Sequence, residues 1–158
     1  MKKIISKFFI VFIIFFYILL KLSSVTLLND QVAILYKNNE ISGVFYSPGT
    51  HYFNPINARI RTVSLKLRNH LFKDFPLKNS KVSAKISWRV TNPKQYVRKF
   101  QSEVFASRWI KGMVYHVLKE TSYSSENIIK SDELIKRCSK YLIDSGIKIK
   151  DISIKISD

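Results

Sequence analysis

Several residue types are scarce in this chain of 158 residues, and each scarcity excludes a class of structure. A single cysteine, Cys138, excludes an internal disulfide framework. Four glycines and four prolines are too few for a collagen-like or low-complexity chain. The histidines (His51, His70 and His116) lie far apart, with no cysteine or carboxylate at ligand spacing. We therefore expect neither a metal site nor a cofactor.

Catalytic signatures are also missing. The sequence contains no Gly-x-Ser-x-Gly and no His-Glu-x-x-His pattern, which mark common hydrolase sites. The carboxylates after residue 100 fall on expected helix starts and exposed faces, where no two of them are forced together: Glu103, Glu120, Glu126, Asp132 and Glu133. A membrane hydrolase is the alternative this pattern disfavours, and we predict a protein that is not an enzyme.

Acidic residues are few, 11 against 27 lysines and arginines, which gives a formal net charge of +16. The basic residues are spread evenly and form no Arg-rich block or nucleic-acid motif. One interpretation is a set of solvated lysines. The other is a cationic surface for acidic lipid headgroups, an acidic protein or another acidic polymer, on a secreted or anchored binding protein. We expect no nucleic acid as partner.

The N-terminal segment, residues 1–28, contains the long apolar run of the chain. Phe8 to Leu20 is uninterrupted, and the 21 residues from Phe8 to Leu28 would span roughly 32 Å as a helix, close to the thickness of a hydrocarbon core. Lys2, Lys3 and Lys7 precede the run, so the positive-inside rule places the N-terminus in the cytoplasm. We predict a signal-anchor transmembrane helix over residues 1–28 and a domain over residues 29–158 on the far side.

A cleaved signal peptide is the competing interpretation of this segment. The apolar core is short enough for one, but no Ala-x-Ala is present and a bulky Leu22 stands where a small residue is needed. These features favour the anchor.

The clearest strand pattern in the domain runs from Lys81 to Val90. Its apolar residues alternate strictly with polar ones, which predicts a strand with one buried face. Asn92-Pro93 ends the strand, because proline cannot continue the ladder. Pro93 is well placed in the first turn of a following helix. Trp88 belongs to the apolar set and Arg89 to the opposite face.

Other elements follow from weaker patterns. The expected strands are Gln31–Lys37, Gly43–Tyr46, Ala58–Leu67 and Ile147–Ile156, with a polar connection over Asn69–Ser80. Asn38-Asn39-Glu40 and Ser47-Pro48-Gly49 are expected turns. In the last strand the isoleucines change phase at Lys150-Asp151, and a bulge there would return all of them to one face. Tyr46, Tyr52 and Phe53 follow the anchor closely, and either sit at lipid headgroup level or pack in the core.

Two amphipathic helices complete the expected elements. The first covers Glu103–Glu120, with Phe105, Trp109, Met113 and Val117 on its apolar stripe and Val114 and Leu118 beside them. The second begins at Ser131, a good N-cap, and Gly146 is expected to close it as the C′ residue. Its stripe contains Cys138, which we read as a buried structural thiol. Strands followed by helices and a last strand predict an α+β fold.

The order of these motifs resembles the SPFH (band 7, stomatin/prohibitin) superfamily. The matching pieces are an anchor, the segment Gly43 to Pro55 with its Pro-Gly-x-His, Trp88-Arg89-Val90 followed by Pro93 and Tyr96, and a closing strand after Ser145-Gly146. The usual Thr-x-Asp ahead of the central strand is replaced by Leu77-Lys78-Asn79. The sequence also ends at Asp158, without the coiled-coil helix into which family members continue.

The resemblance implies a curved mixed or antiparallel sheet with two packed helices and a non-enzymatic membrane scaffold. The Trp-Arg-Val motif and the orientation of the anchor look most like the bacterial HflC/HflK branch. That likeness implies an inner-membrane protein with a periplasmic domain, in contact with the lipid bilayer, which forms homo- or hetero-oligomers with another SPFH protein. It also implies modulation of the membrane AAA protease FtsH.

Candidate contact residues lie on the polar faces of two expected strands. They are the basic residues Lys81, Lys85, Arg89, Lys148, Lys150 and Lys155. Anionic lipid or an acidic partner is the functional interpretation of these residues, and a solvated face is the alternative.

Overall fold

The computed structural model describes residues 2–77, 80–122 and 131–157. The chain divides into two compact units, Met1–Ser64 and Leu65–Asp158. Each unit is antiparallel in all its strand pairs, and helices and strands are both present, so the α+β class is confirmed. The strands form three small antiparallel sheets rather than one continuous curved sheet.

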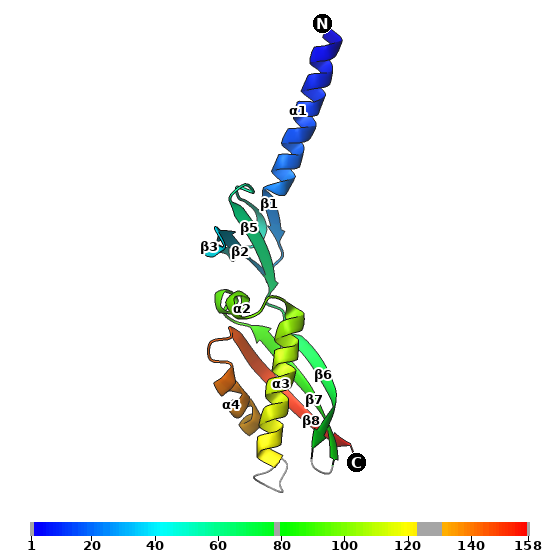
Figure 1. The fold of residues 1–158 in the computed structure, drawn as a ribbon, viewed down its shortest axis with the longest axis vertical. Helices are drawn as coiled ribbons and strands as arrows, with labels where there is room; N and C mark the ends of the chain where they lie inside the picture. The colour runs from blue at the N-terminus through cyan, green and yellow to red at the C-terminus, as the bar shows by residue number, and fades with distance from the viewer. Residues whose placement is uncertain (1, 78–79, 123–130, 158) are drawn as a thin grey trace. The chain divides into compact units, whose positions relative to one another are not determined.

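The first unit contains a helix and two sheets (Figure 1). Strands β1 and β4 pair with each other, and the second sheet has the order β3-β2-β5. Its elements are α1 (Lys2–Leu22), β1 (Ser24–Leu27), β2 (Gln31–Lys37), β3 (Glu40–Phe45), β4 (Gly49–Tyr52) and β5 (Ala58–Ser64).

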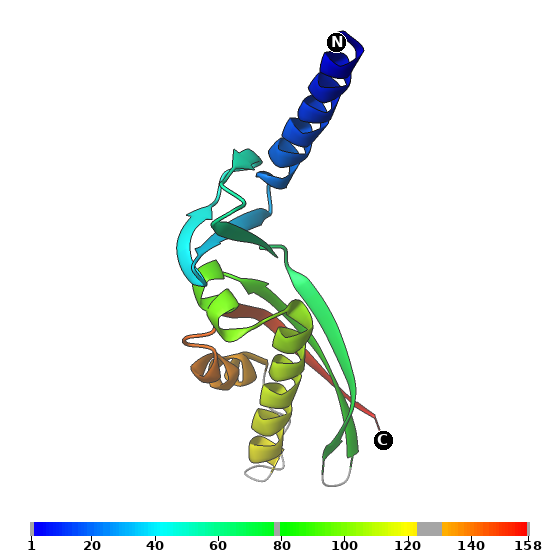
Figure 2. The same cartoon turned by 45° about the horizontal axis from the view of Figure 1, so that its top comes forward.

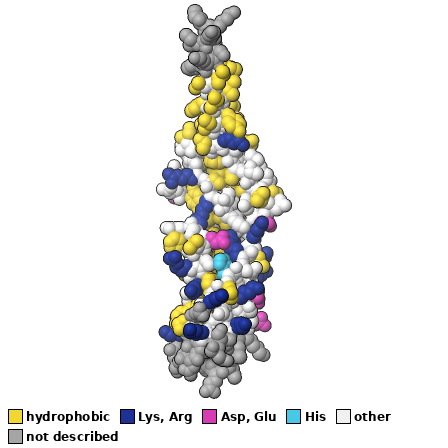
Figure 3. Space-filling model, turned by 90° about the vertical axis from the view of Figure 1, so that its right-hand side faces the viewer, with side chains coloured by type: hydrophobic (Ala, Val, Ile, Leu, Met, Phe, Trp, Pro, Cys, Tyr) yellow, Lys and Arg dark blue, Asp and Glu magenta, His cyan; other side chains and the backbone are white. Residues whose placement is uncertain are grey.

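Helix α1 ends at Leu22, and the chain continues as strand β1 instead of helix. Residues 9–20 are all exposed, and Figure 3 shows hydrophobic side chains along this helix. A backbone hydrogen bond fixes the chain just before strand β1: the amide N of Phe53 donates to the carbonyl O of Ser23 at 2.8 Å. Among the residues that the structure describes, no helix is both long enough and apolar enough to cross a membrane.

The hairpin of β2 and β3 turns at Asn38-Asn39. Both residues have positive φ, 52° and 65°, the backbone of a two-residue hairpin turn in which asparagine is favoured. The predicted strand Gln31–Lys37 is confirmed, whereas β3 begins at Glu40, earlier than predicted. The buried apolar residues of the unit are few: Leu27, Val32, Ala33, Ile34 and Val63.

The second unit is a three-stranded antiparallel sheet, in the order β6-β7-β8, with its helices on one side (Figures 1 and 2). Helix α3 contacts β6, and α4 contacts both β8 and α3. The elements are β6 (Arg68–Leu77), β7 (Ser80–Val90), α2 (Pro93–Lys99), α3 (Glu103–Ser122), α4 (Ser131–Tyr141) and β8 (Ile147–Ser157).

Strand β6 corrects the prediction of a polar connection over Asn69–Ser80. Residues Arg68 to Leu77 pair with β7, with a register shift between Phe72 and Phe75. Pro76 lacks an N–H to donate, but β6 is an edge strand, and one of its sides needs no ladder bonds.

The core of the second unit lies between the sheet and the helices. Trp88 and Ile86 of β7 are 0% exposed, as their alternation predicted. Four of the six residues predicted for the apolar stripe of α3 are buried, namely Met113, Val114, Val117 and Leu118, whereas Phe105 is exposed and Trp109 is half-buried. Ala106 and Ile110, which were not predicted, are also buried. The full buried set of α3 is Ala106, Ile110, Met113, Val114, Val117, Leu118 and Thr121.

The predicted bulge in the last strand is confirmed. Asp151 lies opposite Ser87 and Ile149 opposite Trp88, so Lys150 is the extra residue in β8. The shift places the isoleucines on both sides of the bulge opposite core residues of β7.

Candidate functional site: the open face of the β6-β7-β8 sheet

Five of the six predicted contact residues lie on one face of the sheet, which we call the open face because the helices cover the other one. On β7, Lys81, Lys85 and Arg89 share this face by strand alternation. On β8, residues directly opposite a β7 residue point the same way. Lys155 therefore joins the face opposite Ser83, and Lys148 joins it opposite Arg89. Lys150 is exposed at the bulge, outside this row.

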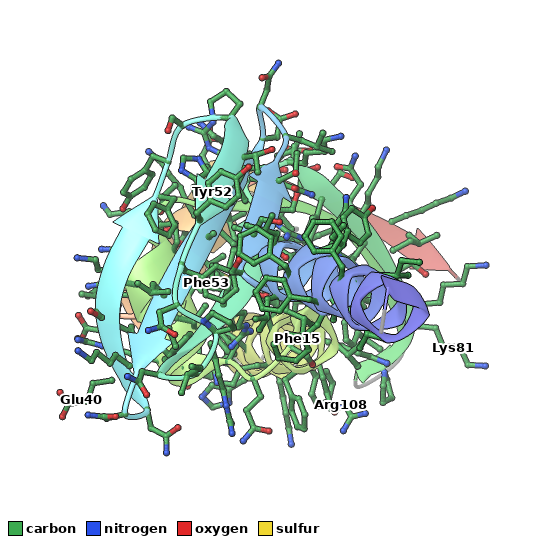
Figure 4. All side chains as sticks on the ribbon, turned by 90° about the horizontal axis from the view of Figure 1, so that it is seen from above. Phe15, Glu40, Tyr52, Phe53, Lys81 and Arg108 are labelled. Carbon is green, nitrogen blue, oxygen red and sulfur yellow. The ribbon has the colours of Figure 1, made fainter. Side chains whose placement is uncertain are left out.

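The open face is strongly cationic. The five residues are exposed, and Figure 4 shows Lys81 extending away from the ribbon. Asp151, opposite Ser87, supplies negative charge to the same face. The ion pairs found among the described side chains join Arg68 to Glu103, His116 to Glu120 and Arg137 to Glu133, and none involves these five cations.

A shallow hollow of about 500 Å³ occupies the middle of the open face. Charged and hydroxyl side chains from all three strands line it together with an exposed leucine: Lys73, Lys85 and Lys155, Ser83 and Ser153, and Leu71. The sequence prediction missed Lys73 and Leu71, because their segment was expected to be a connection. No sequence signal marked them, because Leu71 and Phe72 are both apolar and the segment lacks a regular alternation of polar and apolar residues.

Thr91, Asn92 and Gly146 join the ends of β7 and β8 to the start of α2. The amides of Thr91 and Asn92 both donate to the carbonyl O of Gly146, at 2.8 and 3.1 Å. Gly146 was predicted as the C′ residue of the helix that begins at Ser131, but α4 already ends at Tyr141. Gly146 has φ of 67°, and a Cβ there would overlap the carbonyl O of Asn92 and approach the N of Tyr96 at 2.7 Å. Asn92 also caps α2, accepting from the amide of Gln95 at 3.2 Å. These residues therefore fix the fold and leave the open face free.

A serine–histidine contact lies on the covered side of the sheet. Ser107 Oγ lies 3.2 Å from His70 Nδ1, and the His70 ring stacks on Phe72 and Trp88. The neighbouring carboxylate of Glu103 bonds to Arg68 Nε at 2.9 Å instead of to the histidine. Arg68 lies in turn over the Trp88 ring. These contacts pack the first two turns of α3 against β6.

Cys138 is buried, as predicted. Removal of the thiol from water raises its pKa from 9.0 to about 12, so the group stays a neutral thiol. Among the described residues, no group of three or more histidine, cysteine, aspartate or glutamate side chains could hold a metal ion.

Comparison with known families identifies the fold. The family described as SPFH domain / Band 7 family has a model that matches residues 25–155. The chain belongs to the SPFH/Band 7 family. The match begins within β1 and ends within β8, so it covers the strands of both units and leaves α1 outside. Band 7 proteins are in general membrane-associated scaffolds rather than enzymes. No curated protein matches the chain.

Proposed function

We propose that this Band 7 protein is a membrane-anchored, non-enzymatic scaffold. The observation that carries the proposal is the apolar helix ahead of the domain: residues 9–20 of α1 expose their side chains all around the helix. A helix that is apolar on every side is buried by protein or by lipid. Figure 4 shows Phe15 projecting outward from α1, in keeping with a lipid-facing role.

The aromatic residues next to α1 support the same role. The pairing of β1 with β4 sets Tyr52 opposite Ser24, two residues after the helix ends. Tyr52 is 69% exposed and Ile56 is 84% exposed, so neither packs in the core. Phe53 is half-buried. Amphipathic aromatic side chains at such a boundary suit the headgroup layer.

For the orientation, we propose a single-pass anchor in a bacterial inner membrane, although no helix among the described residues is by itself long and apolar enough to span one. Lys2, Lys3 and Lys7 would remain in the cytoplasm, and the Band 7 domain would lie in the periplasm. As the narrower assignment, we propose an HflC-like oligomer that modulates FtsH. The Trp88-Arg89-Val90 motif and the basic residues ahead of the apolar run support this assignment.

Alkaline carbonate extraction tests the anchor. The protein should remain in the membrane pellet, whereas the double variant Ile13→Lys/Ile14→Lys should move to the supernatant, because charge within the apolar helix opposes insertion. Val104→Lys/Ile143→Lys is the matched control, since it adds the same charge at two exposed apolar residues outside the N-terminal segment, and it should stay in the pellet. Extraction of the unaltered protein would contradict the anchor.

Blue-native electrophoresis of detergent-extracted protein, combined with crosslinking to FtsH, tests the scaffold. We expect species larger than a monomer and an adduct with the protease. A strictly monomeric protein without an adduct would contradict the scaffold, and oligomers without an adduct would contradict only the HflC-like assignment.

A further inference from the structure

We infer that the open face binds an acidic, amphipathic polypeptide segment of a partner protein. The inference rests on the proposed scaffold function, for which it names the chemistry of the partner. The face is a sheet surface without a covering layer in the part of the chain described, since α3 and α4 both lie on the opposite side.

The positive charge of the open face favours an acidic binding partner. Six cations line it or its hollow, against the single carboxylate of Asp151 among the side chains described there: Lys73, Lys81, Lys85, Arg89, Lys148 and Lys155. An acidic occupant would neutralise this charge, whereas a basic one would add to the repulsion.

The spacing of the cations selects an extended occupant over a small anion. Lys81, Lys85 and Arg89 recur every four residues along β7, about 13 Å apart at roughly 3.3 Å per residue. The row is therefore about 26 Å long, and a single phosphate group would meet only one part of it. A helix of about 18 residues has this length.

Exposed apolar residues at the edge of the open face favour a polypeptide with an apolar side. Leu71 of β6 is 58% exposed opposite Lys85, and the exposed Pro76 lies opposite Lys81. Leu71 and Pro76 thus expose apolar surface beside the cationic row, on either side of Lys73 in the sequence, which fits a segment carrying acidic residues on one side and apolar residues on the other. The described residues of the face include no aromatic side chain on which nucleic-acid bases could stack.

Fluorescence anisotropy of the full chain in detergent micelles tests the inference. The probe is a labelled helical peptide of about 18 residues, with glutamates on one side and leucines on the other. We expect the double variant Lys85→Gln/Lys155→Gln to raise its Kd by roughly fivefold or more. Leu71→Ser should raise the Kd by roughly threefold.

Lys94→Gln/Lys140→Gln is the matched control, because it removes the same charge from exposed positions on α2 and α4. Its Kd should stay within about twofold of the unaltered protein. An equal loss in both double variants would overturn the inference, since it would reflect net charge alone. Arg89→Gln/Lys148→Gln, at the other end of the row, gives a second variant should the first fail to fold.

Competition separates the possible occupants. Phosphatidylglycerol in mixed micelles and a single-stranded oligonucleotide should each displace the peptide weakly. If either binds through Lys85 and Lys155 while the peptide does not, lipid or nucleic acid replaces the acidic partner and the inference is overturned. Carbonate extraction and blue-native electrophoresis test the proposed scaffold separately from the peptide experiment. If the protein is a membrane-bound oligomer but does not bind the peptide, this inference is overturned and the proposed scaffold function is not.

Discussion

The two faces of strand β7 are made by neighbouring residues and have opposite environments. Trp88 is 0% exposed beneath the helices, while Arg89, the next residue, is exposed on the open face. The covered face determines stability, because its side chains fill the core. The open face contributes little to stability and carries the charge that a partner would recognise. This difference separates residues that preserve the fold from residues that serve binding.

Trp88→Ala, on the covered face of β7, should lower the stability of the second unit more than any other variant considered below. The change leaves a cavity under α3 and should lower the free energy of unfolding of the second unit by about 4 kcal/mol. Arg89→Ala, one position along, should change it by less than about 0.5 kcal/mol. Urea unfolding followed by tryptophan fluorescence checks both variants, and similar losses for the two would contradict the assignment of faces.

Gly146→Ala should have the next largest effect. The new Cβ would overlap the carbonyl O of Asn92, and the positive φ of 67° would be strained, for a loss of about 3 kcal/mol. Gly112→Ala is the control, because a Cβ there meets open space within helix α3. That change should stabilise the unit by about 0.5 to 1 kcal/mol. Denaturation midpoints that move in the same direction would contradict this account.

Asn92→Ala removes the cap of α2 and should cost about 1 kcal/mol. Asn92→Ser retains a capping oxygen and should recover most of the loss. Thermal unfolding of the variants tests this ranking, and a Ser variant no better than the Ala variant would show that the cap is not the cause.

Cys138 should give the smallest effect under ordinary conditions, and one that depends on pH. Burial favours the neutral thiol in the folded state, so its contribution is complete below the unfolded pKa of 9.0 and is lost as the pH rises toward the folded pKa of about 12. The difference in unfolding midpoint between the unaltered protein and Cys138→Ala should therefore shrink as pH rises above about 9. A pH-independent difference would contradict the proposed cause.

The sequence predicted elements with strong periodicity and missed those without it. Strand β7, its Asn-Pro corner and the bulge in β8 could be found because alternation and phase were clear. Strand β6 was missed because Pro76 argues against a strand unless an edge position is known. On α3 the stripe was predicted correctly at Met113 and Val117 but not at Phe105, which is exposed, whereas the small neighbouring Ala106 is buried.

The candidate site could be predicted only in part. Alternation placed the cations on the polar faces of two strands, but it could not show that these strands pair. The register between β7 and β8 joins residues far apart in sequence, and it brings Lys155 and Lys148 beside the β7 row. Lys73 and Leu71 entered the site through β6 and had no signal of their own in a segment taken as a connection.

The most direct test of this division between faces measures two quantities on one protein, Lys85→Gln/Lys155→Gln. We predict that its affinity for the acidic amphipathic peptide falls roughly fivefold. We also predict that its free energy of unfolding, read from tryptophan fluorescence, stays within about 0.5 kcal/mol of the unaltered protein. Unchanged affinity together with a clear loss of stability would contradict the claim that the open face serves binding and the covered face serves the fold.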